Sequence, residues 1–256
     1  MKSVILAGGM GSRFAEETSL RPKPMVEIGG QPMLWHIMNI YAAHGFKDFV
    51  VACGYKGDYI RNYFTNYHLN AGDLFVDLTA NSTEVISSSA PDWRLWLMDT
   101  GLMTMTGGRL LRLRDLLENE RFMLTYGDGV ADLDIGALLD FHKAHGKIAT
   151  VTAVQPPGRF GRMIMEDDQV VRFSEKENIS GEWINGGFFV FEPEIFDYLD
   201  DDETILERSP MERLSSEGQL MAYRHHGFWS HMDTIHERNT LEDLWNGGAA
   251  PWKTWT

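Results

Sequence analysis

The sequence predicts an α/β fold with a mostly parallel sheet and a small antiparallel extension toward the C-terminus. Through the first 150 residues, short apolar runs alternate with segments in which apolar residues recur at helical spacing, a pattern typical of parallel sheets covered by helices. After about residue 155, glycine, proline and short β-rich pieces replace the long helical patterns. The chain has 256 residues, of which 43% are hydrophobic, so it can bury the core of one such domain.

The first half of the chain supplies most of the predicted sheet. Strands are expected over 3–7, 48–52, 95–98, 122–126 and 149–154, and helices over 32–44, 57–67, 109–117 and 134–145. Pro32 and Gly45 mark the two ends of the first helix, and Asp134 is suited to cap the last one. Ligands of such sheets bind at the carboxyl ends of the strands, so a site is expected where 3–7 and 122–126 end.

The second half is predicted to extend the same sheet rather than to form a separate domain. Its strands are expected over 170–173 and 187–191, and its helices over 208–218 and 236–245. No internal repeat or low-complexity segment interrupts the chain. We therefore expect a single domain over 1–256.

A glycine cluster follows the first predicted strand, with Gly8, Gly9 and Gly11 leading to Arg13. Glycines let successive backbone N–H groups approach an anion closely, and an arginine can close such a site with a bidentate fork. Lys23 stands between two prolines that hold its backbone, and the polar segment 16–21 before it is expected to be a loop. This pattern favours phosphate binding, and a glycine loop without a ligand remains the alternative.

Two common phosphate loops do not fit this cluster. No Gly-Lys-Ser or Gly-Lys-Thr follows it, as a Walker loop requires. Phe14 stands where the dinucleotide-binding fingerprint needs a small residue.

A carboxylate ends the predicted strand 122–126, because Asp128 stands there between Gly127 and Gly129. A carboxylate at a strand end suits magnesium, which takes one or two such ligands together with phosphate oxygens and water. A turn aspartate or a helix cap is the alternative for the same pattern. The nine histidines do not predict a zinc site, because pairs such as His142 and His145 lack partners at zinc-ligand spacing.

Composition limits the classes of partner. With 23 Lys and Arg against 37 Asp and Glu, the net charge is −14, which disfavours general binding to nucleic acid or to an anionic membrane. The single cysteine, Cys53, cannot form an internal disulfide and is expected to be a buried residue. The apolar run after Lys2 is too short for a signal peptide, and no run reaches the roughly 18 residues of a membrane span. The cytoplasm is the expected location.

Several motifs together resemble one enzyme family. The segments LAGGMGSR at 6–13 and KPMVEIGGQP at 23–32 are similar to the signature of the sugar-1-phosphate nucleotidylyltransferases. Further segments resemble the branch of that family that transfers a cytidylyl group to glucose 1-phosphate, and they lie at 39–54, 99–101, 105–109, 126–132, 156–161, 184–189 and 250–255. The resemblance implies a Rossmann-like three-layer sandwich of the nucleotide-diphospho-sugar transferase type, with a mixed and mostly parallel sheet.

The resemblance also implies a reaction and the residues that carry it. CTP and α-D-glucose 1-phosphate would give CDP-glucose and pyrophosphate, with Mg²⁺ as the cofactor and a surface polysaccharide as the destination of the sugar. The catalytic residues implied are Arg13, Lys23, Asp128 and Asp233, of which the two aspartates would bind the metal. The nucleotide-binding residues implied are Leu6, Ala7, Gly8, Gly9, Met10, Gly11, Ser12, Arg13, Lys23, Thr104, Arg109 and Gly127. The sugar-phosphate residues implied are Glu175, Lys176, Asn185 and Gly186.

The same resemblance divides the chain into a nucleotide-binding half over 1–154 and a sugar-binding and oligomerisation half over 155–256. Three tryptophans near the C-terminus, Trp245, Trp252 and Trp255, are either core anchors or a subunit contact, and we expect the contact. The family implies a homo-oligomer larger than a dimer, such as a hexamer.

The sequence departs from the family at Glu177, where proline is common, and at Leu102 and Met103, which replace a more polar pair. Thr104 stands where serine is usual and keeps the hydroxyl. These departures concern the base and the sugar rather than the phosphate chemistry. Two other functions therefore stay open, namely the same chemistry with dTTP, UTP or another phosphorylated acceptor, and a nucleotide-sugar binding protein without turnover.

Overall fold

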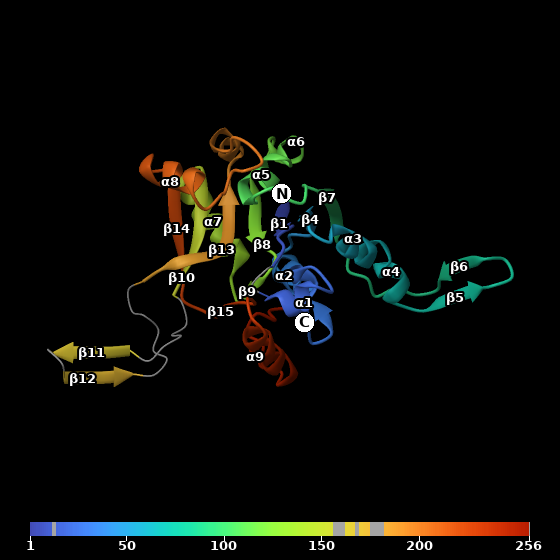
Figure 1. The fold of residues 1–256 in the computed structure, drawn as a ribbon. Coiled ribbons are helices and arrows are strands. Elements are labelled where there is room, and N and C mark those ends of the chain that lie inside the picture. The colour runs from blue at the N-terminus through green and yellow to red at the C-terminus, as the bar shows by residue number, and fades with distance from the viewer. Residues whose placement is uncertain (12–13, 156–161, 167–168, 175–181, 256) are drawn as a thin grey trace.

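A seven-stranded sheet forms the centre of the computed structural model, which describes residues 1–11, 14–155, 162–166, 169–174 and 182–255 (Figure 1). The strand order is β14–β10–β13–β8–β1–β4–β7. In that order the strands span Leu220–His225, Ala149–Val154, Ile184–Phe191, Phe122–Tyr126, Ser3–Ala7, Asp48–Cys53 and Arg94–Asp99. All neighbours are parallel except β13, which runs antiparallel to both β8 and β10. The predicted mixed and mostly parallel sheet is confirmed.

Helices cover both faces of this sheet, so the fold is a three-layer sandwich. One face packs against α2 (Met33–Ala42), α3 (Gly57–Thr65), α7 (Ile135–His145) and α9 (Ile235–Asn246). The other face packs against α5 (Thr106–Leu111), α6 (Arg114–Leu117), α8 (Ser209–Ser216) and the 3₁₀ helix η3 (Pro193–Tyr198). Strand β1 serves both cores, because Ile5 and Ala7 face the first cluster while Val4 and Leu6 face the second.

The predicted elements of the first half are largely confirmed. Strands β8 and β10 have the predicted bounds, and Asp134 caps α7 by accepting a hydrogen bond from the Ala137 N–H at 2.9 Å. The helix expected over 109–117 is two short helices, α5 and α6, and it begins earlier. Gly107 and Gly108 look like helix breakers in the sequence, but a Cβ on Gly108 would lie 2.5 Å from the Asp202 carbonyl oxygen. These two glycines of α5 therefore allow the helix to pack closely against the segment 202–204.

The prediction of a loop over 16–21 is wrong for residues 16–18, because Ala15–Thr18 forms the one-turn helix α1. The Thr18 hydroxyl donates to the carbonyls of Phe14, at 3.0 Å, and Gly11, at 3.2 Å. Such a turn is too short for its apolar spacing to be recognised in the sequence. A second short helix that was not predicted is α4 (Tyr67–Asn70), which follows α3.

The second half extends the sheet as predicted, although not entirely with antiparallel strands. Strand β13 is antiparallel, whereas β14 joins β10 in parallel. Four small ladders lie outside the main sheet. They pair β2 (Glu27–Ile28) with β3 (Gln31–Pro32), β5 (Leu74–Asp77) with β6 (Ser82–Val85), β9 (Gly129–Ala131) with β15 (Trp229–His231), and β11 (Arg162–Glu166) with β12 (Gln169–Ser174).

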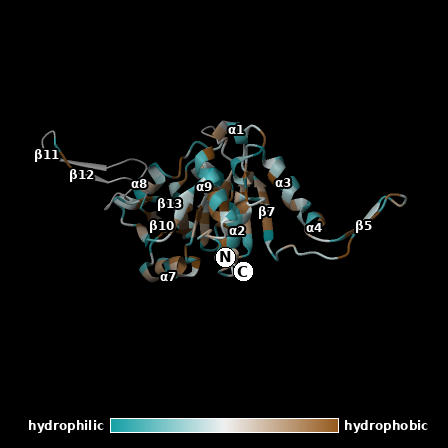
Figure 2. Ribbon diagram, turned by 90° about the horizontal axis from the view of Figure 1, so that it is seen from below, coloured by the Kyte–Doolittle hydropathy of each residue, from teal (hydrophilic) through white to brown (hydrophobic). Residues whose placement is uncertain are grey.

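Two of these hairpins project from opposite sides of the molecule (Figures 1 and 2). The β5–β6 hairpin extends beyond α3 and α4, and the β11–β12 hairpin extends beyond β10 and β13. The β5–β6 hairpin carries apolar side chains in solvent, with exposed fractions of 54% for Phe75, 90% for Leu78 and 66% for Ile86. Within the residues that the structure describes, no helix is both long enough and apolar enough to cross a membrane.

The C-terminal tryptophans do not all lie at the surface. Trp252 is only 1% exposed, stacks on Phe228 with ring centroids 5.6 Å apart, and donates from its indole nitrogen to Nδ1 of His36 at 3.4 Å. Burial lowers the pKa of His36 to about 4, so this ring is neutral at pH 7 and can accept that bond. The expected subunit contact is therefore wrong for Trp252, which is a core anchor. Trp245 and Trp255 pack against the same cluster but are only partly buried.

Candidate active site

Two cavities open at the carboxyl edge of the sheet and share one wall. Each has a volume of about 390 Å³. The shared wall is formed by Tyr126, Asp128 and Asp233, which line both cavities. Two ligands bound in these cavities would therefore meet beside two carboxylates.

The glycine loop after β1 forms the floor of the first cavity. The Leu6 carbonyl accepts a hydrogen bond from the Gly127 N–H at 3.0 Å, which joins the ends of β1 and β8. A Cβ on Gly127 would lie 2.7 Å from Cγ of Pro24 and 2.9 Å from the Leu6 oxygen. Only glycine allows this approach, which brings the Lys23 turn against the end of β8.

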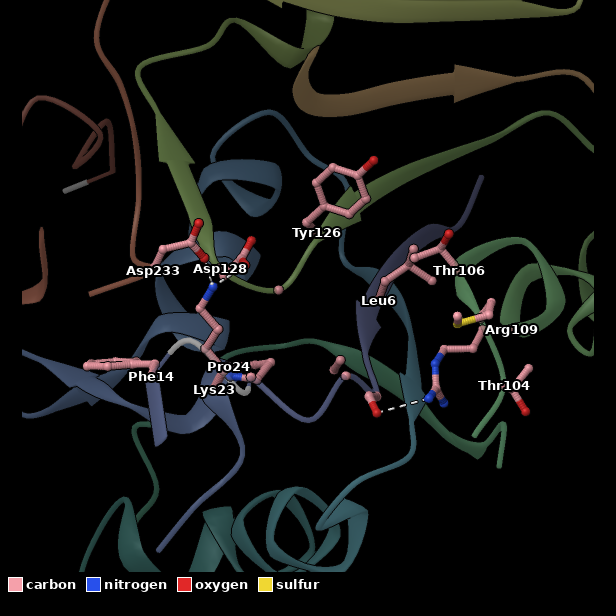
Figure 3. A pocket seen from close by; sticks show the side chains of 16 residues that line it. Leu6, Phe14, Lys23, Pro24, Thr104, Thr106, Arg109, Tyr126, Asp128 and Asp233 are labelled. Atoms are coloured by element: carbon pink, nitrogen blue, oxygen red, sulfur yellow. Dashed lines mark hydrogen bonds and ion pairs between the residues drawn. The ribbon is translucent and has the colours of Figure 1, made fainter. Parts of the chain in front are cut away.

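Lys23 lies between the two carboxylates at the shared wall (Figure 3). It begins the 3₁₀ turn η2 (Lys23–Met25), in which Pro24 and Met25 are buried, and the prolines on either side fix the backbone as predicted. Its ammonium donates to Oδ2 of Asp128 at 2.6 Å and also to Oδ1 of Asp233. Burial opposes the charge of the ammonium and is the largest single influence, but the two carboxylates outweigh it and raise the pKa of Lys23. Lys23 is a fixed cation in an acidic chain.

A short ladder brings Asp233 to Asp128. Strand β15 pairs with β9 so that His231 lies opposite Gly129, and the Met232 N–H donates to the Asp128 carbonyl at 2.9 Å. The Thr234 hydroxyl caps α9 by accepting from the Glu237 N–H, and the Glu237 carboxylate accepts from the Asp233 N–H. Hydrogen bonds of Asp233 and of its neighbours Met232 and Thr234 therefore hold this segment in place.

The two aspartates fit a magnesium ion by their chemistry. Both already converge on one cationic group, the Lys23 ammonium, and both are partly exposed to the cavities, at 31% and 27%. Within the described chain, no cluster of three or more His, Cys, Asp or Glu side chains is arranged to hold a metal. An ion at this wall would therefore take its remaining ligands from phosphate oxygens and water, as magnesium commonly does.

Arg109 is buried beneath the glycine loop, with an exposed fraction of 4%. Its guanidinium donates to the carbonyls of Gly8 at 2.9 Å and Gly101 at 2.6 Å, and to the Thr100 hydroxyl at 2.8 Å. These bonds tie the loop after β1 to the loop after β7. The predicted role of Arg109 in binding the nucleotide stays a prediction. The hydrogen bonds give this residue a structural role as well.

Arg109→Lys is expected to lower the free energy of unfolding by about 2 kcal/mol, because buried carbonyls lose donors that one ammonium cannot replace in the same plane. Urea unfolding measures this change. The matched control is Arg112→Lys, on the same helical segment, whose guanidinium pairs with Asp202 at the surface. Equal stability of the two variants would contradict the role assigned to Arg109.

Asn185 and Gly186, from β13, line the second cavity. The Asn185 side-chain oxygen accepts from the Gly187 N–H at 2.8 Å, and its amide nitrogen donates to the Tyr126 hydroxyl at 3.1 Å. The Trp229 indole donates to the Gly186 carbonyl at 2.7 Å. An aromatic ring and an oriented amide in one wall suit a sugar ring with its hydroxyls.

The structure brings most of the predicted site residues together. The predicted residues that line the first cavity are Leu6, Ala7, Gly8, Gly9, Gly11, Lys23, Thr104, Arg109, Gly127, Asp128 and Asp233. Met10 lies beside them, 45% exposed, without lining the cavity. Ser12, Arg13, Glu175 and Lys176 lie outside the described residues, so their predicted roles stay predictions. Cys53 is buried, and burial raises its pKa to about 11, as expected of a thiol that is not a nucleophile.

Several residues of the two walls were not predicted from the sequence. Phe14, Pro24, Thr106 and Tyr126 line the first cavity, and Trp229 and His231 line the second. Tyr126 could have been found, because it ends the same strand that leads to Asp128. Trp229 and His231 carry no local signal, because only the pairing of β15 with β9 places them at the site.

The chain is similar to known proteins over its full length. The chain matches the family described as nucleotidyl transferase over residues 2–231. It is 53% identical over 256 residues to a glucose-1-phosphate cytidylyltransferase of Salmonella typhi, and 41% identical over 256 residues to a probable glucose-1-phosphate cytidylyltransferase of Bacillus subtilis (strain 168). Both alignments cover 100% of each chain.

The fold is also similar to the crystal structure of a putative glucose-1-phosphate thymidylyltransferase from Bacillus anthracis. The TM-score is 0.64, and the match covers 98% of this chain and 95% of the other. The two sequences are 19% identical, so this likeness concerns the fold.

Proposed function

The chain belongs to the nucleotidyl transferase family, and from this premise we propose that it transfers a cytidylyl group from CTP to α-D-glucose 1-phosphate, giving CDP-glucose and pyrophosphate. The observation that carries the proposal is the wall that the two cavities share. One cavity has the glycine loop and would take the nucleotide. The other has Asn185 and Trp229 and would take the sugar.

The reaction needs no nucleophile from the protein. A phosphate oxygen of glucose 1-phosphate attacks the α-phosphorus of CTP in line, forming one P–O bond while the bond from that phosphorus to the β-phosphate bridging oxygen breaks. Two anions must meet, and negative charge develops on the leaving pyrophosphate. The protein therefore contributes position and positive charge.

Within the part of the chain that the structure describes, Lys23 places a cation where the two ligands would meet. We assign it to the α-phosphate or the incoming sugar phosphate, because its ammonium lies at the shared wall. Asp128 and Asp233 would hold Mg²⁺, which when bound neutralises phosphate charge and orients the phosphate oxygens. The backbone N–H groups of the glycine loop would bind the triphosphate.

The remaining assignments follow the family motifs. Arg13 would hold the triphosphate and the leaving pyrophosphate, and Lys176, beside Glu175, would meet the sugar phosphate. The half over 1–154 would bind mainly the nucleotide and the half over 155–256 mainly the sugar, although Asp233 lines the first cavity and Thr125 the second.

A matrix of substrates tests the proposed function. Four nucleoside triphosphates, CTP, dTTP, UTP and GTP, are each combined with glucose 1-phosphate, mannose 1-phosphate and galactose 1-phosphate, and pyrophosphate release is measured. CTP with glucose 1-phosphate is expected to exceed every other pair in kcat/KM by at least about tenfold, since even one methylene of difference between two substrates is worth about 1–3 kcal/mol. A higher value for another base or acceptor would replace the assignment. Binding without pyrophosphate release would indicate a nucleotide-sugar binding protein.

We further propose that the chain is a cytoplasmic homo-oligomer larger than a dimer, such as a hexamer. The support is the β5–β6 hairpin, whose apolar side chains Phe75, Leu78 and Ile86 project into solvent in the single chain. Light scattering on the purified protein measures the subunit number. The location follows from the substrates, because nucleoside triphosphates and sugar phosphates are made in the cytoplasm.

A further inference from the structure

One carboxylate that lines neither cavity connects the walls of both. Glu207 lies in the loop between η3 and α8, and each of its two oxygens accepts one hydrogen bond. Oε1 accepts from the Tyr126 hydroxyl at 2.6 Å, and Oε2 accepts from the Thr106 hydroxyl at 2.6 Å. Thr106 and Tyr126 both line the first cavity, and Tyr126 also lines the second.

The loop that carries Glu207 is anchored to the start of α5. The Asp202 carbonyl accepts from the Met105 N–H at 2.8 Å, and the Thr204 carbonyl accepts from the Gly107 N–H at 2.9 Å. The Leu206 N–H in turn donates to the Thr106 hydroxyl at 3.0 Å. These bonds place the Glu207 carboxylate independently of any ligand.

Glu207 fixes the direction of both hydrogen bonds of the Tyr126 hydroxyl. A carboxylate only accepts, so the single proton of the Tyr126 hydroxyl must point to it, and the Tyr126 oxygen is left to accept from the Asn185 amide nitrogen. The Asn185 oxygen accepts from the Gly187 N–H, which gives the amide the same orientation.

We propose that Glu207 is a positioning residue for the sugar-phosphate acceptor: through the Tyr126 hydroxyl it orients the Asn185 amide, so that one N–H and one lone pair of that amide face the second cavity. A sugar hydroxyl both donates and accepts, and this pair of groups matches it. The proposal rests on the proposed function, because it assigns the second cavity to the sugar. The proposal adds to that function a hydrogen-bond network that connects Thr106, in the wall of the first cavity, with Asn185, in the wall of the second.

The test compares steady-state constants of Tyr126→Phe, Glu207→Ala and the double variant with those of the unaltered enzyme. Each single change is expected to raise KM for glucose 1-phosphate about five- to tenfold, the effect of losing one orienting hydrogen bond. The KM for CTP is expected to rise less than the KM for glucose 1-phosphate, because the glycine loop and Lys23 are unaltered, although Thr106 and Tyr126 also line the first cavity. The double variant is expected to be no worse than the worse single variant, since both act through one network.

The matched control is Glu203→Gln, which changes an exposed carboxylate in the same loop. It is expected to leave both KM values unaltered. Thermal unfolding of each variant is measured in parallel, because a merely structural loss would lower stability and affect both substrates equally.

Asn185→Ala distinguishes a failure of the inference about Glu207 from a failure of the proposed sugar site. If it raises KM for glucose 1-phosphate while Tyr126→Phe and Glu207→Ala do not, the inference about Glu207 is wrong and the sugar site stands. Equal increases in KM for both substrates in the Tyr126 and Glu207 variants would also overturn it. If Asn185→Ala leaves that KM unaltered, the assignment of the second cavity to the sugar fails, and the inference fails with it.

Discussion

Lys23→Met is expected to lower kcat about 100- to 1,000-fold, the usual loss when one preorganised charge-stabilising donor is removed. Methionine keeps the length and the apolar stem of the side chain and removes only the ammonium. That ammonium lies at the wall shared by the two cavities, with 11% of the side chain exposed. Rapid-quench measurement of a single turnover reports the chemical step directly and separates it from product release.

The control for this prediction is Lys47→Met, whose ammonium pairs with Asp92 at the surface at 2.7 Å. Its turnover is expected to equal that of the unaltered enzyme. Lys23→Met also leaves Asp128 and Asp233 facing each other without a cation, so thermal unfolding with and without Mg²⁺ is measured for both variants. A Lys23→Met enzyme that is folded and retains near-normal single-turnover rates would remove Lys23 from the chemistry.

The second large effect is expected at the carboxylates. Asp128→Asn and Asp233→Asn should each raise the Mg²⁺ concentration for half-maximal activity at least about tenfold, because the charge of the ligands sets the affinity of such sites. Asparagine keeps the shape of the side chain and its hydrogen-bonding oxygen but removes the negative charge. A titration of activity against Mg²⁺ at fixed CTP measures the shift, and calorimetric titration of Mg²⁺ measures the binding itself.

Asp134→Asn is the matched control, since it makes the same chemical change a few residues further on. Asp134 is 63% exposed and caps α7, a position that asparagine fills equally well. Its Mg²⁺ titration is expected to be unaltered. An unshifted titration for Asp128→Asn or Asp233→Asn would take that aspartate out of the proposed metal site.

The electrostatic arrangement explains why both effects should be large. The chain carries a net charge of −14, which repels phosphorylated substrates at long range. The attraction that holds these substrates must then come from a few cations in direct contact with their phosphates. Lys23 between two aspartates is such a local group: the carboxylates keep it charged, and its pKa is raised despite burial.

The sequence alone determined the elements that depend on short-range patterns. The apolar runs of β1 and β8, the helical spacing of α2 and the glycines after β1 are all local, and neighbouring residues impose them. Lys23 between its prolines and Asp128 between its glycines could be recognised for the same reason. The family motifs added Asp233, which the local pattern by itself does not distinguish from other aspartates.

Only the tertiary structure decided which distant residues meet. The pairing of β15 with β9 brings Asp233 to Asp128. The packing of α5 under the glycine loop lets Arg109 donate to the Gly8 carbonyl. The loop before α8 brings Glu207 to Tyr126. The tertiary structure also places Trp252 in the core, whereas a surface position was expected from the sequence. These contacts depend on strand register and on close packing between segments far apart in the chain, which neither spacing nor composition encodes.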